Sequence, residues 1–152
     1  MPMDEEVLEF YKQHRVGQDK YTYFLLAIVA AAIGFAVQKT EGLCFSWWLL
    51  PVALAVVSWG VSFFFGCKNL LWVQAALGAN YNLLQLRKGV HPEQPQHPAE
   101  AQAAVQGVNE ALRLNIHSAQ FYGIWQFRSL VVGAVFFIAW RVLEMYRLTY
   151  VA

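Results

Sequence analysis

Two long apolar runs separated by a short polar stretch dominate the hydropathy pattern of this chain. They cover Tyr23–Val37 and Phe45–Phe65, and residues 38–42 between them are polar or glycine. The second run carries no charge over about 20 residues, the length with which an α-helix crosses roughly 30 Å of hydrocarbon. Because every backbone N–H and C=O must be paired inside a bilayer, two such runs predict a transmembrane helical hairpin over residues 21–66.

A third apolar run, Leu130–Trp140, predicts a third membrane helix within residues 129–152. Arg141 and Glu144 follow this run, three residues apart on one helical face, where their side chains are close enough to pair. Charged side chains near the end of a membrane helix reach toward the interface. We therefore expect an intramembrane ion pair between Arg141 and Glu144 near the end of this helix.

Between the second and third spans, residues 67–128 show the alternating spacings of 3 and 4 that are typical of a coiled-coil seam. In the first half the seam positions are Leu70, Val73, Leu77, Asn80, Leu84 and Arg87. In the second half they are Val105, Val108, Leu112, Asn115, Ala119 and Tyr122. A loop at 89–98 with three prolines separates the halves. The pattern predicts an antiparallel cytoplasmic hairpin whose second helix begins at Pro98 or Ala99 and continues into the third span.

Two seam positions are polar. Asn80 is 13 residues past Cys67 and Asn115 is 13 residues before Arg128, which places both about 20 Å below the membrane edge in such a hairpin. A polar residue in a seam costs stability but fixes register and oligomer state. We expect the two asparagines to form hydrogen bonds within or between copies of the chain. The alternative is a polar ring that lines a channel vestibule.

Small residues follow one face of each helix of the membrane hairpin. The second helix has Ser58, Ser62 and Gly66 at four-residue spacing, and the first has the small pairs Ala27 with Ala31 and Ala30 with Gly34. Small side chains let membrane helices approach closely. We expect close packing along these stripes; for Ser58, Ser62 and Gly66 the alternative is a pore wall.

The N-terminal segment, residues 1–20, is predicted to form a short amphipathic helix. Asp4 suits its N-cap, and the helix is expected to run through about Arg15 and to end at Gly17. With the N-terminus in the cytoplasm, eight Lys and Arg residues lie inside and three outside, which agrees with the positive-inside rule. The C-terminus is therefore expected outside.

Composition excludes several classes of function. The 152 residues are 58% apolar and 14% charged, far below the charge content of roughly 25% in soluble domains. A net charge of +1 gives no electrostatic reason to bind nucleic acid. No phosphate-binding glycine loop, CxxC pair, HExxH or GxSxG motif occurs, and we expect no cofactor and no metal.

The two cysteines flank the second membrane run. A helix holds Cys44 and Cys67 about 34 Å apart, so they cannot form a disulfide with each other. We expect two partly buried thiols, the alternative being a Cys44 disulfide between copies.

Arg113 and His117 lie four residues apart on one helical face, and Asn115 lies between them in the sequence. This arrangement resembles the Arg-then-His motif of HEPN ribonucleases, in which two motifs meet across a dimer to cleave RNA. That motif has four to six intervening residues and this chain has three. The resemblance implies a membrane-bound ribonuclease as one alternative function.

The order of elements resembles small multi-helix bacterial membrane effectors of anti-phage systems of the CRISPR and CBASS kind, some of which form rings that breach the inner membrane. We expect an all-α integral membrane protein with three transmembrane helices and a cytoplasmic hairpin. The expected function is a homo-oligomeric inner-membrane pore or permeabilising effector, assembled and gated by the hairpin. The main alternative is a non-conducting anchor that recruits a soluble cytoplasmic protein.

Overall fold

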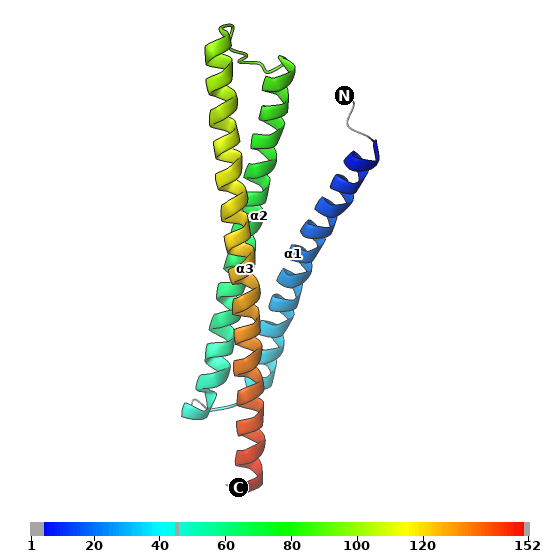
Figure 1. The fold of residues 1–152 in the computed structure, drawn as a ribbon. Helices are drawn as coiled ribbons and strands as arrows, with labels where there is room; N and C mark the ends of the chain where they lie inside the picture. The colour runs from blue at the N-terminus through cyan, green and yellow to red at the C-terminus, as the bar shows by residue number, and fades with distance from the viewer. Residues whose placement is uncertain (1–4, 45, 151–152) are drawn as a thin grey trace. The chain divides into compact units, whose positions relative to one another are not determined.

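The computed structural model describes residues 5–44 and 46–150, and they form three long helices (Figure 1). These are α1 (Glu5–Thr40), α2 (Leu50–Lys88) and α3 (Pro98–Tyr150), with a short 3-10 helix η1 (Trp47–Leu49) before α2. The described residues contain no strand. All three helices include a segment long and apolar enough to cross a membrane. The expectation of an all-α chain is confirmed, and its three apolar helices indicate an integral membrane protein.

The predicted helix end at Gly17 is wrong, because α1 continues without a break from Glu5 to Thr40. A glycine inside a helix costs only about 1 kcal/mol relative to alanine, which the neighbouring helical residues offset. The predicted N-cap, Asp4, lies outside the described residues.

The other helix ends agree with the sequence. Gly89 follows the last residue of α2 with a φ of 70°, and Val90 N–H donates to the carbonyl of Gln85 at 3.1 Å. This left-handed glycine with a bond back over the last turn is a Schellman-type end. Pro98 begins α3, where its missing N–H costs nothing. As predicted, α3 then runs unbroken to Tyr150.

The chain divides into two compact units. The first consists of Met1–Gly66 and Ile124–Ala152, and the second of Cys67–Gly123. In the first unit the buried positions of α2 advance by alternating steps of three and four residues: Val52, Ala55, Trp59, Ser62 and Gly66. That spacing is the seam of a left-handed helical bundle.

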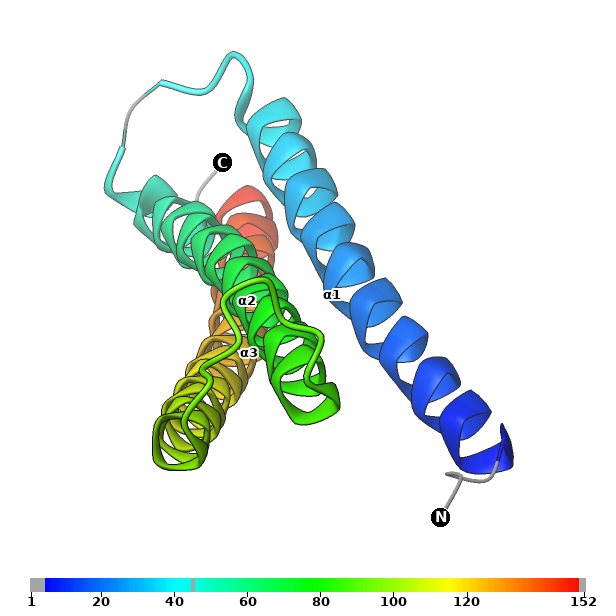
Figure 2. The ribbon, with the colours of Figure 1, turned by 90° about the horizontal axis from the view of Figure 1, so that it is seen from above.

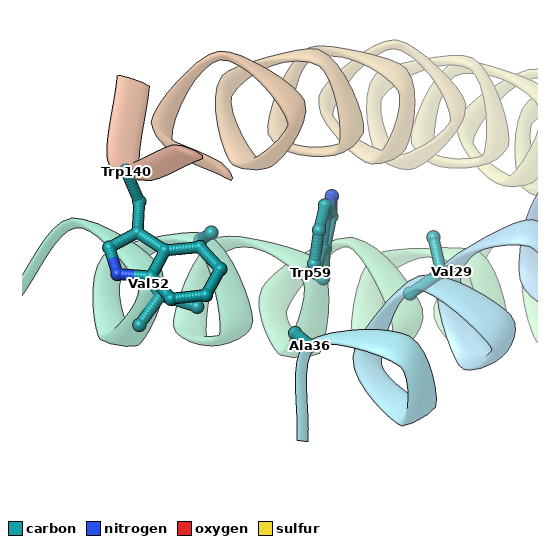
Figure 3. Close-up of a cluster of buried hydrophobic side chains, with 6 residues drawn as sticks. Val29, Ala36, Val52, Trp59 and Trp140 are labelled. Atoms are coloured by element: carbon teal, nitrogen blue, oxygen red, sulfur yellow. The ribbon is translucent and has the colours of Figure 1, made fainter. Parts of the chain in front are cut away.

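Tryptophans fill the centre of the first unit (Figure 3). Trp140 points from α3 toward Val52 of α2 and is 1% exposed. The ring of Phe137 lies between the two indoles, with ring centroids 5.6 Å from Trp59 and 5.6 Å from Trp140. Val29 and Ala36 close this cluster from α1.

The second unit consists of the remainder of α2, the loop after Gly89, and the first half of α3, and the two helices lie side by side in both views (Figure 2). The predicted seam of α3 is buried or half-buried at every position, with Ala119 buried. On α2 the last two predicted seam positions are wrong: Leu84 is 48% exposed and Arg87 is exposed, whereas Leu83 is buried and Leu86 is half-buried. A straight helix drifts by about 20° per heptad from a 3.5-residue repeat, so spacing alone did not select between adjacent leucines.

Gly133 allows α3 to approach the indole of α2. A Cβ at position 133 would lie 2.5 Å from two ring atoms of Trp59, whose side chain is buried and enclosed by its neighbours. We predict that Gly133→Ala lowers the free energy of unfolding by about 1–3 kcal/mol through overpacking. Reversible unfolding in mixed micelles measures it.

Gly60 is the matched control, because a Cβ there meets nothing within 4 Å. Gly60→Ala should leave stability unchanged or slightly raised. Equal effects of the two substitutions would contradict the close approach at Gly133.

Candidate functional site

Among the residues whose burial the structure describes, three uncharged polar side chains are buried in the first unit, one on each helix. Thr22 of α1 is 8% exposed, Ser62 of α2 is 0% exposed and Gln126 of α3 is 1% exposed. We call Ser62 and Gln126 the polar layer, because they touch each other. Leu26, one turn beyond Thr22 on α1, lies beside the same layer. A polar side chain inside the membrane costs free energy, and such side chains usually face the bundle interior.

Two side chains of α2 bind backbone carbonyls of α3. The hydroxyl of Ser62 donates to the carbonyl of Gln126 at 2.7 Å, and the indole N–H of Trp59 donates to the carbonyl of Leu130 at 3.2 Å. Each carbonyl has a second lone pair in addition to the one used within its helix. Hydrogen bonds between membrane helices average about 0.6 kcal/mol and reach about 1.7. Together the two bonds fix the axial register of α2 against α3.

The side chain of Gln126 fits a space that only glycine leaves open. A Cβ at position 66 would lie 2.6 Å from Nε2 of Gln126 and 2.7 Å from Cδ2 of Leu26. Because position 66 is glycine, the side-chain amide of Gln126 can lie against the backbone of α2 there. Among the described residues, Nε2 of Gln126 has no hydrogen-bond partner, and an unpaired buried amide costs about 1–3 kcal/mol.

The predicted residues Ser62 and Gly66 thus lie in the contact between α2 and α3, while Ser58 is half-buried. This placement has the geometry of close packing, the first of the two roles expected for the stripe. A pore wall would need side chains that face an opening, whereas Ser62 and Gly66 face Gln126.

The asparagines and the Arg–His pair lie in the second unit. Asn80 and Asn115 are half-buried, and neither side chain forms a hydrogen bond with another residue in the part of the chain that the structure describes. Their bonding between copies stays a prediction. Arg113 and His117 are both exposed on α3, and RNA cleavage by them also stays a prediction.

The predicted pair of Arg141 with Glu144 is wrong. Glu144 instead accepts a hydrogen bond from Arg147 at 2.8 Å, and the guanidinium of Arg141 lies 5.7 Å from the ring centroid of Trp140. Side chains on a helix lean toward its N-terminus. The side chain of Arg147 therefore leans toward Glu144, whereas that of Arg141 leans away from it.

The expected burial of the thiols is also wrong, because Cys44 and Cys67 are both free and exposed. Cys44 directly precedes the apolar run Phe45–Phe65 and Cys67 closely follows it, and neither is a buried seam position.

In the proline-rich loop, Nδ1 of His91 accepts a hydrogen bond from the backbone N–H of Glu93 at 3.1 Å. The described residues contain no group of three or more His, Cys, Asp or Glu side chains that could hold a metal ion.

Sequence reasoning missed Gln126, Gly133 and Trp140, which carry the packing of the third span. A signal was present: they follow Ala119 at intervals of seven, which continues the heptad of the preceding segment into the membrane. The predicted seam ends at Tyr122, one residue before Gly123 and short of these positions.

Gln126 allows a direct test of the unpaired amide. Gln126→Met keeps an unbranched side chain of similar length over Gly66 and removes the unpaired N–H group. We predict an increase of about 1–3 kcal/mol in the free energy of unfolding, measured in mixed micelles. A loss of stability would show instead that the amide forms a bond that holds the bundle together.

Comparison of the chain with protein-family models, with curated proteins and with solved structures gives no match in any of the three. The function is therefore argued from the geometry of the chain itself.

Proposed function

We propose that this protein is a homo-oligomeric membrane protein that permeabilises the bilayer, with its copies held together by helix faces that a single chain leaves exposed. The observation that carries the proposal is the surface of the second unit. No Asp, Glu, Lys or Arg occurs between Lys68 and Arg87, and large apolar side chains are exposed along both helices: Leu71, Tyr81, Leu84, Leu114, Ile116 and Phe121.

The topology that we propose places the second unit in the cytoplasm, with the N-terminus inside and the C-terminus outside, since this puts most lysines and arginines inside. In water, a contiguous exposed apolar surface marks an interaction site. The shortage of charge over a whole helical segment favours a self-complementary contact, in which the same surface of another copy covers it.

The membrane-spanning part of α1 supports self-association independently. Its small residues Ala27, Ala30, Ala31 and Gly34 are exposed, and a Cβ at Gly34 would meet nothing within 4 Å. The close-packing stripe predicted for α1 is therefore not used inside one chain. Small residues favour tight contact between membrane helices, and a second copy supplies the helix that this face lacks.

Any conducting path in this proposal runs between copies. Within one chain the bundle is filled by Trp59, Phe137 and Trp140, and Ser62 is fully buried with its hydroxyl bonded to the carbonyl of Gln126. Opening would therefore follow from the arrangement of copies, and in this proposal association of the second units controls that arrangement.

The same filled interior also favours an alternative function. In it, the protein is a non-conducting anchor that recruits a soluble protein through the exposed face of the second unit. Purified full-length chain in phosphatidylcholine vesicles separates the two functions. Our proposal predicts a defined oligomer in mild detergent and release of a small entrapped dye. A defined oligomer without release would favour the anchor, and a monomer would overturn the proposal.

Gly34 tests the contact on α1. Gly34→Leu fills open space in one chain, so the fold should persist, but we predict a shift from oligomer to monomer on detergent size-exclusion chromatography with light scattering. Gly60→Leu is the control, because position 60 is equally open on α2. The same oligomer for Gly34→Leu as for the wild type would exclude this face from the interface.

The asparagines test the role of the second unit. Asn80→Leu or Asn115→Leu should strengthen assembly while giving mixed stoichiometries, because an apolar seam residue gains burial but loses the polar contact that fixes oligomer state. Mass measurement in detergent checks this, and an unchanged single stoichiometry would contradict it.

A further inference from the structure

The contacts within the first unit set the level of α3 against α1. Leu26 and Gln126 both approach the position of a Cβ at Gly66, and farther along the helices Phe35 lies 5.9 Å from Phe137 between ring centroids. From the first contact to the second, the residue number rises on α1 from 26 to 35 and on α3 from 126 to 137. The two helices therefore run in the same direction. A residue of α1 is therefore level with the residue about 100 positions later in α3.

Two lysines mark the ends of the membrane segment of α1. Lys20 and Lys39 bracket an uncharged stretch, and they lie about 28 Å apart along the helix, close to the hydrocarbon thickness of roughly 30 Å. Arg141 is four residues beyond Phe137, as Lys39 is beyond Phe35, so Arg141 lies at the same boundary as Lys39. The opposite boundary is the level of Lys20.

Arg128 lies on the hydrocarbon side of the boundary at Lys20. It follows Gln126 by two residues, so it is level with the part of α1 six to eight residues past Lys20, about 10 Å into the hydrocarbon. Its side chain is exposed, and its guanidinium lies 5.5 Å from the ring centroid of Trp125. Within the described part of the chain, no carboxylate lies within ion-pair distance of Arg128.

A second copy of the chain offers no anion at this depth. The sequence has no Asp or Glu between Lys20 and Glu41, between Glu41 and Glu93, or between Glu110 and Glu144. The membrane-spanning segments of every parallel copy are therefore free of carboxylates. The anion that remains available in a bilayer is the phosphate of a phospholipid, which a guanidinium binds with two parallel hydrogen bonds.

We propose that Arg128, seated on Trp125, binds the phosphate of a phospholipid in the leaflet on the Lys20 side and draws that headgroup into the membrane beside α3. The side chain leans toward the N-terminus of α3, and so toward that leaflet, because Cβ bonds tilt that way. Arg128 and Arg141 lie about 20 Å apart along α3. This is shorter than the hydrocarbon core, and a short span is accommodated by local thinning.

Solid-state NMR tests the contact. The probe is full-length protein with ¹⁵N-labelled arginine in phosphatidylcholine vesicles, in phosphate-free buffer so that lipid is the only source of ³¹P. We expect the guanidinium signal that Arg128→Gln removes to be dephased by ³¹P. The matched control, Arg113→Gln, removes a signal that is not dephased. A signal from Arg128 without ³¹P dephasing overturns the proposal and points to a protein partner.

A spin label tests the local thinning of the bilayer. This experiment does not use Arg128→Gln, so it does not depend on whether that variant keeps the native fold. With Cys44 and Cys67 replaced, a label at Val132, exposed one turn beyond Arg128, should be more accessible to a water-soluble nickel reagent than a label at Val57. Val57 is exposed on α2 at a similar depth. Equal accessibility at the two positions would refute local thinning. Neither measurement depends on dye release or on oligomeric state, so failure here is distinct from failure of the proposed pore.

Discussion

The contact between α2 and α3 in the first unit is the interaction on which the rest depends. Inside hydrocarbon the hydrophobic effect does not hold helices together, so close packing and hydrogen bonds do. Here Ser62 and Trp59 of α2 reach carbonyls of α3 at 2.7 and 3.2 Å. Gly66 and Gly133 provide the room, since a side chain at either position would collide with Gln126 or with the indole.

This register has consequences along the whole membrane segment. It buries Gln126 with one amide group unpaired, and it turns Arg128, two residues later, to the outside of the bundle. The same helix therefore has one polar side chain that the bundle encloses and one charged side chain that it leaves to its surroundings. The first contributes to specific packing, and the second is the group that we propose to bind lipid phosphate. The exposed faces on α1 and on the second unit are those that we propose for contact between copies.

The sequence predicted the elements well where a local signal was strong. Gly89 and Pro98 mark helix boundaries through backbone chemistry alone, and the uncharged run after Phe45 predicts a membrane span. It predicted partners poorly where two choices differed by small energies. Leu83 rather than Leu84 faces α3, and Arg147 rather than Arg141 pairs with Glu144, because helix drift and side-chain lean select between neighbours at similar spacing.

By itself the sequence determined an all-helical membrane chain, since uncharged runs of this length must pair their backbone groups internally wherever they lie in lipid. Only the tertiary structure decided which small residues are used. Ser62 and Gly66 lie against Gln126, whereas Ala31 and Gly34 remain exposed on α1. Both stripes consist of small residues at four-residue spacing. Which one is buried depends on the bulky side chains that face it from another helix, and that information is spread over residues distant in the sequence.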